Sequence, residues 1–122
     1  YASLLGILYI GLAFNIIRLR RKFKVGIGSG DNKFLAKAIR IHGNFAEYIP
    51  LALILLAVYE LNGASVMVLH ALGATLVVGR ALHAIGLTKS IGISIQRQVG
   101  MMSTFLVILI LAIENIRSFI VA

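Results

Sequence analysis

The stretch "AIRIHGNFAEYIPLALILLAVYE", residues 38–60, decides the fold because it joins a polar helix to a membrane span. Its second half is almost wholly apolar, whereas its first half carries Arg40, His42, Asn44 and Glu47. An ionisable side chain at the centre of a bilayer costs about 2.5–3.5 kcal/mol on insertion scales. We therefore expect these polar side chains to face protein, a cavity or the membrane interface rather than lipid tails.

The composition of the whole chain agrees with a membrane protein. Of the 122 residues, 60% are apolar and 13% are charged, and the mean hydropathy is +0.99. Soluble domains have about 45–50% apolar and about 25% charged residues. The length predicts a single domain over residues 1–122. The absence of cysteine excludes disulfides, thiolate metal ligands and a cysteine nucleophile.

Four apolar segments lie at about 1–17, 49–59, 65–85 and 99–113, and a polar helical lead-in from about Asn32 precedes the second. A helix crosses the hydrocarbon core in about 20 residues, so the polar flanks must continue as helix. The breaks are short and rich in Gly and Ser, and Asp31 or Asn32 is placed to cap the second helix. The sequence predicts an all-α, integral membrane bundle of four helices running up-down-up-down.

Charge in the connections sets the expected orientation. Under the positive-inside rule, the first and third connections face the cytoplasm and both termini lie on the other side. The second connection has Glu60 and no basic residue. Arg117 is an exception that pairs with Glu114 at i, i+3. The basic residues of the first and third connections are Arg18, Arg20, Arg21, Lys22, Lys24, Lys33, Lys37, Lys89 and Arg97.

The formal net charge of +8 is explained by these juxtamembrane cations, which contact anionic lipid. No nucleic-acid-binding motif and no interleaving of basic and aromatic residues is present, so we expect no nucleic-acid partner. We expect no metal site either, because His42 and His83 lack a partner at a metal-ligand spacing.

A polar stripe follows one face of the second helix. Arg40, Asn44, Glu47 and Tyr48 fall at i, i+4, i+7 and i+8, which places all four side chains on the same face. The stripe is roughly two turns long, about 12 Å, at the cytoplasmic end of the helix.

The other helices bring polar side chains to the same level. Arg80 and His83 sit at i and i+3 of the third helix, and Arg97 opens the fourth. Glu47 is the one acid at this level within a span, so cations outnumber anions. That surplus predicts a pocket for an anionic, carboxylate-bearing ligand. The alternative is structural glue, in which Glu47 pairs with Arg80 across helices and Asn44 bonds a neighbouring helix.

The same residues resemble a known family. "AIRIHGNFAEYIPL" is similar to the helix-two signature of the MAPEG family, the membrane-associated proteins in eicosanoid and glutathione metabolism. "RLRRKFKV", "GRALHAIGL" and "RQVGMMST" resemble its first, third and fourth helices, the last in the bacterial branch. The resemblance covers most of the chain. It implies a homotrimer in the bacterial inner membrane, with glutathione as cosubstrate bound between neighbouring subunits.

The resemblance also implies residue roles. Arg40, Asn44, Glu47 and Tyr48 would hold the tripeptide, with Glu47 at its α-amino group and Arg40 at a carboxylate. Arg97 would be the catalytic residue, because an adjacent guanidinium lowers the pKa of a thiol from about 8.5 and so yields the nucleophilic thiolate. The thiolate would attack a lipophilic electrophile that enters from the bilayer, as in a glutathione transferase or peroxidase. The remaining expected binding residues are Arg20, Arg21, His42, Arg80 and His83.

Two positions depart from the family pattern, because family enzymes often carry Tyr where this chain has His83 and Leu87. Some members of the family bind lipophilic ligands without catalysis. The alternative function is therefore a non-catalytic membrane protein that binds lipophilic anions or lipids. A small multidrug carrier is disfavoured, since such carriers rely on a membrane-embedded Glu in the first helix, which has no acid here.

Overall fold

The computed structural model describes residues 1–89 and 95–121, apart from the side chains of 87–89. It contains four α-helices, and no strand occurs in the described ranges. Each helix is long and apolar enough to cross a membrane. The all-α prediction is confirmed, and the polar flanks do continue as helix. The helices are α1 (Ala2–Phe23), α2 (Lys33–Leu61), α3 (Val66–Lys89) and α4 (Ile95–Val121).

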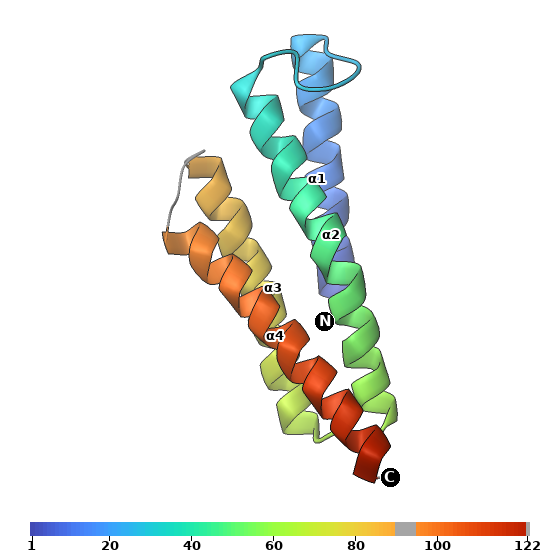
Figure 1. Ribbon diagram of the computed structural model, residues 1–122. Helices are drawn as coiled ribbons and strands as arrows, with labels where there is room; N and C mark the ends of the chain where they lie inside the picture. Colours follow the sequence, from blue (N-terminus) through green and yellow to red (C-terminus); the bar gives the residue numbers. More distant parts are fainter. Residues whose placement is uncertain (90–94, 122) are drawn as a thin grey trace.

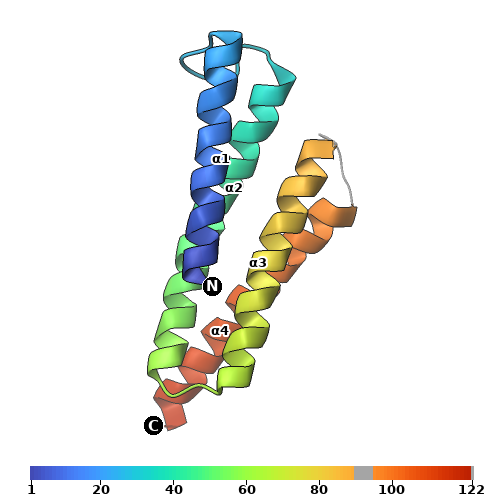
Figure 2. The same ribbon diagram turned by 180° about the vertical axis from the view of Figure 1, so that it is seen from behind.

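The four helices run up and down in turn, as two helical hairpins (Figures 1 and 2). α1 packs on α2, and α3 packs most closely against α4. The hairpins lie together near the α2–α3 connection and diverge toward the α1–α2 connection (Figure 1). The connection at 90–94, which carries part of the predicted third loop, lies outside the described residues.

The apolar core is divided into two parts. The larger part holds the hairpins together and includes Leu5, Ile49, Leu76 and Leu111, one from each helix. The smaller part, formed by Leu19, Leu35 and Ala38, joins only α1 to α2 beside their connection. Between α2 and the α3–α4 hairpin, at the level where the hairpins begin to diverge, polar side chains replace the apolar core.

Most of the apolar surface faces outward. Large side chains such as Ile7, Phe14, Ile54 and Leu109 are more than half exposed on the isolated subunit. In water this exposure would be costly, whereas lipid tails are as apolar as these side chains. The chain is a multi-pass membrane protein, as its composition predicts.

Polar contacts also tie α2 to the far end of α4. The Nδ2 of Asn115 donates to the carbonyl of Leu55 at 3.0 Å, and the hydroxyl of Tyr59 lies 3.5 Å from Glu114. Glu114 forms the predicted ion pair with Arg117, at 2.6 Å.

Asn32 caps α2, as one of the two predicted capping residues. Its Oδ1 accepts a hydrogen bond from the backbone N–H of Leu35 at 3.0 Å. We expect Asn32→Ala to lower the free energy of unfolding by about 1 kcal/mol, because an N–H of the first turn loses its acceptor. Chemical unfolding in detergent measures the change. Asn32→Asp keeps the oxygen and should retain the wild-type value; equal losses in both variants would contradict the capping role.

Candidate functional site

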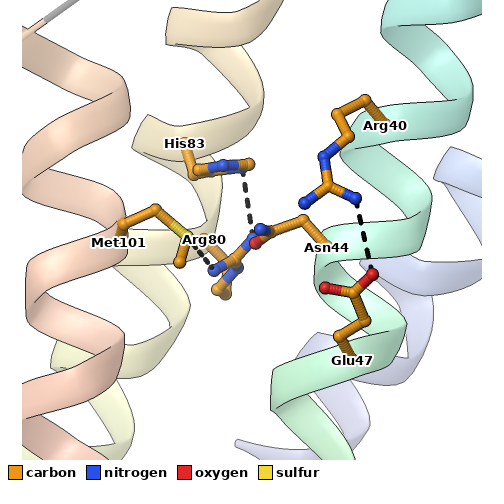
Figure 3. A network of polar contacts seen from close by, with 6 residues as sticks. All are labelled: Arg40, Asn44, Glu47, Arg80, His83 and Met101. Atoms are coloured by element: carbon orange, nitrogen blue, oxygen red, sulfur yellow. Dashed lines mark hydrogen bonds and ion pairs between the residues drawn. The ribbon is translucent and has the colours of Figure 1, made fainter.

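The polar centre of the molecule is the guanidinium of Arg80, which joins three helices. Arg80 is 2% exposed, and His83, one turn further along α3, is equally buried. From Arg80, Nη2 donates to the Oδ1 of Asn44 on α2 and lies 3.1 Å from the Nδ1 of His83. Nη1 donates to the hydroxyl of Thr104 on α4 at 3.3 Å. Figure 3 shows how Asn44, Arg80 and His83 converge between α2 and the α3–α4 hairpin.

The stripe on α2 lies on one face, as predicted, but its two edges have different environments. Asn44 is buried against α3, and Tyr48 packs edge-on against Phe105 of α4, with 5.3 Å between ring centroids. Arg40 and Glu47, one on each side of Asn44 along α2, form an ion pair of 3.4 Å with each other (Figure 3). The Arg40 and Glu47 side chains are each 52% exposed, so this pair contributes only about 0–1 kcal/mol to stability and is open to a ligand.

The observed pairings agree only in part with the alternative that these polar residues serve only to hold the helices together. Asn44 does bond a neighbouring helix, as that alternative expects. Glu47 does not pair with Arg80, because its carboxylate contacts Arg40 of its own helix. The one acid at this level is therefore left at the accessible edge, and the cation of Arg80 has neutral partners.

Arg97 borders this cluster from α4. Together with Gln98, Met101 and Met102 it lines a hollow of about 380 Å³. The sulfur of Met101 lies 3.7 Å from the Nη1 of Arg80, so the hollow is next to the buried guanidinium. The charges of Arg40, Arg80 and Arg97 all lie close enough to His83 to act on it electrostatically. Three helices thus place cations around one point.

Three residues of the expected set lie apart from this point in the single subunit. His42 is two residues from Arg40, about 200° around the helix, and its ring stacks on Tyr9 of α1, with 4.9 Å between centroids. The Nη1 of Arg20 donates to the carbonyls of Val25 and Gly28, so Arg20 holds the first loop. Arg21 is exposed at the end of α1.

The structure also shows a contact that the sequence reasoning missed. α3 and α4 approach each other closely where Gly79 meets Gly100. A Cβ built on Gly100 would lie 2.5 Å from the carbonyl oxygen of Gly79 and 2.7 Å from the backbone nitrogen of His83. The signal was present as small residues on two apolar helices, which is how membrane helices come close.

The cluster is chemically suited to a ligand that carries carboxylates together with one ammonium group. Arginine presents several donors to carboxylates, and the single carboxylate of Glu47 suits an ammonium group. In the described ranges, no group of three or more His, Cys, Asp or Glu could hold a metal ion. The side chain of Leu87, at a position where the family pattern has Tyr, lies outside the described residues.

Comparison with known proteins identifies a family and two relatives. Residues 1–117 match the MAPEG family. The chain is 36% identical to inner membrane protein YecN of Escherichia coli K12 over 116 residues, which cover 95% of this chain and 87% of the relative. The same protein of Escherichia coli O6:H1 strain CFT073 gives the same values. No solved structure matches.

Proposed function

The chain belongs to the MAPEG family, and from that premise we propose that it is a membrane-bound glutathione transferase or peroxidase-like enzyme. It activates the glutathione thiolate for attack on lipophilic electrophiles. The observation that carries the proposal is that three cations from three helices, Arg40, Arg80 and Arg97, all act electrostatically on His83. The carboxylate of Glu47 pairs with one of them, Arg40.

Glutathione matches the charges at this point. It carries two carboxylates, one ammonium group and one thiol. Arg40 takes a carboxylate and Glu47 takes the α-amino group, because their mutual ion pair is weak and accessible. Asn44 and Tyr48 follow the tripeptide along α2. The thiol then lies toward α4, where Arg97 lines the hollow.

Arg97 supplies the catalytic charge. The thiol loses its proton to solvent, and the guanidinium stabilises the remaining thiolate. The sulfur attacks an electrophilic carbon of the second substrate, so a carbon–sulfur bond forms while the bond to the leaving group breaks. That substrate arrives through the apolar surface, because Met101 and Met102 line the hollow and belong to a helix that is apolar enough to span the membrane.

In this proposal the active unit is a homotrimer. Its place in the bacterial inner membrane is supported by the name of the relative, an inner membrane protein. In this assembly Arg21, which is exposed at the end of α1, reaches the site of a neighbouring subunit. The Arg40–Glu47 pair, which is half exposed on the single subunit, would face the same neighbour in this trimer. The first and third connections face the cytoplasm, where glutathione is available.

Glutathione should protect the purified protein from unfolding. At ten times its Kd a ligand that binds only the folded state adds about 1.4 kcal/mol, so millimolar glutathione should raise the midpoint of thermal unfolding in detergent. Glu47→Gln should abolish most of this shift, because the ammonium group loses its counter-charge. Lys33→Ala, which changes the net charge by one unit elsewhere on α2, should keep the full shift. An unchanged midpoint for the wild-type protein would contradict the proposal.

A second function is favoured by the residues that line the hollow beside Arg97. One cation with two methionines suits the head and tail of an amphiphilic anion. A non-catalytic protein that binds lipophilic anions would be stabilised by a fatty-acid-like carboxylate and not by glutathione. The same unfolding measurement with both ligands distinguishes the two functions.

A further inference from the structure

Arg80 is a buried cation that has no acidic partner within residues 1–89 and 95–121. Among the described residues its four Nη hydrogens are directed to Asn44, His83, Thr104 and Met101, none of which is charged in the neutral form of the imidazole. Its Nε is buried and has no hydrogen-bond partner. A guanidinium can only donate hydrogen bonds. Every atom that it contacts must therefore act as an acceptor.

This requirement fixes the orientation of Asn44. Because the Oδ1 of Asn44 accepts from Arg80, the amide NH2 must be directed away from the guanidinium. In the part of the chain that the structure describes, this NH2 group has no hydrogen-bond partner, and it is not among the fully buried unpaired groups. Asn44 therefore presents two hydrogen-bond donors to the α2 side of the cluster.

The same requirement fixes the tautomer of His83. Its Nδ1 lies 3.1 Å from the Nη2 of Arg80, so Nδ1 must be the unprotonated, accepting nitrogen. The proton of the neutral imidazole is then on Nε2. His83 thus offers a single N–H donor, as a tyrosine hydroxyl at that position would.

We propose that Arg80 is a positioning residue, which holds Asn44 and His83 as hydrogen-bond donors, so that this side of the site takes only an acceptor group of the ligand. The thiolate or a carboxylate is admitted here, and an ammonium group is rejected. The ammonium end is directed instead to Glu47, the half-exposed acid one turn further along α2. The ligand thereby binds in one direction. The assignment of these groups to glutathione rests on the proposed function; the orientation of Asn44 and His83 does not.

The tautomer of His83 can be measured on the wild-type protein. The chain has three histidines, so spectra of 15N-histidine-labelled protein in detergent can be assigned with His83→Gln. At pH 7 we expect one imidazole with a proton on Nε2 and none on Nδ1 to disappear in that variant. A proton on Nδ1 of His83, alone or with one on Nε2, would overturn the proposal, and this readout needs no glutathione.

Arg80→Lys tests whether the guanidinium is the cause. A single ammonium group cannot serve Asn44 and His83 in the same geometry, so we expect a mixture of His83 tautomers and about a tenfold rise in KM for glutathione. Arg18→Lys is the matched control, because Arg18 donates to the Oδ1 of Asn15 at 2.8 Å on the surface. The control should change neither quantity. A single, unchanged tautomer in Arg80→Lys would contradict the proposal.

Asn44→Asp separates positioning from stability. The carboxylate gives Arg80 an acidic partner, so the variant should be at least as stable as the wild type. Its second oxygen now faces the ligand as an acceptor, so binding of glutathione should weaken by tenfold or more. Undiminished binding in a folded Asn44→Asp protein would overturn the proposal. Absence of glutathione binding by the wild type would instead overturn the proposed function and leave the His83 result to stand.

Discussion

Arg97→Ala should lose about 10²-fold in the rate at which glutathione is conjugated to a reactive aryl halide, the usual cost of removing one group that stabilises the developing anion. The thiol of glutathione has a pKa near 8.5, so only about 3% of it is thiolate in water at pH 7. Arg97 lines the hollow in which the sulfur would lie and is one of the cations grouped around His83. Without it, the bound thiol behaves as it does in water.

The role of Arg97 also predicts how the rate depends on pH in the wild type and in the variant. In the wild-type protein the guanidinium favours the thiolate, so the rate should level off well below pH 8.5. In Arg97→Ala the rate should continue to rise with pH until it passes about 8.5, where the thiol ionises unaided. Steady-state rates between pH 6 and 9 in detergent measure both curves.

Binding of glutathione separates activation from affinity. Glutathione should still raise the unfolding midpoint of Arg97→Ala, because Arg40 and Glu47 hold its charged ends. Gln98→Ala, which removes the neighbouring polar side chain of the same hollow, is the matched control and should keep most of the rate. A wild-type rate in Arg97→Ala, or a loss of protection as large as the loss of rate, would show that Arg97 is not the activating group.

The four helices and the shared face of the polar residues on α2 were predictable, because the membrane and the helix impose simple rules. A span must satisfy its own backbone and have a minimum length, so four apolar runs with polar flanks predict four helices. The period of the helix then places Arg40, Asn44, Glu47 and Tyr48 on one face. Both predictions hold in the structure.

The pairings within the site were not predictable to the same degree. A helical face as broad as this stripe touches more than one environment, and the period does not say which edge meets which neighbour. In the structure Asn44 accepts a hydrogen bond from Arg80, whereas Glu47 forms a half-exposed ion pair with Arg40. The resemblance to the family signature predicts His42 in the site, whereas its position two residues from Arg40 places it on another face of α2, where it contacts Tyr9.

Arg20 shows that the role of a side chain beside a loop is also hard to predict from the sequence. Its basic character predicted either a ligand contact or a role in topology, whereas the structure uses its guanidinium to hold the carbonyls of Val25 and Gly28. A Gly-rich loop has no periodic pattern, so its backbone course, and hence its need for donors, is not readable from residue types alone.

The contact between Gly79 and Gly100 leads to the second large expected effect, because it sets how closely α3 and α4 pack. In Gly100→Ala the new Cβ meets backbone atoms of Gly79 and His83 at 2.5–2.7 Å, and backbone cannot rotate away as a side chain can. The two helices must therefore shift apart at this point. Overpacking of this kind typically costs about 1–3 kcal/mol.

Gly100→Ala should disturb the hydrogen bonds of Arg80 as well as the packing of the two helices. Thr104 donates to the carbonyl of Gly100 at 2.9 Å and accepts from Arg80, so a shift of α4 moves an acceptor of the buried guanidinium. We therefore expect Gly100→Ala to lower the unfolding midpoint and to weaken glutathione protection together. Gly11→Ala is the matched control: a Cβ there meets nothing within 4 Å, and alanine favours helix. If Gly100→Ala were as stable as Gly11→Ala, close approach of α3 and α4 would not be what holds Arg80 in place.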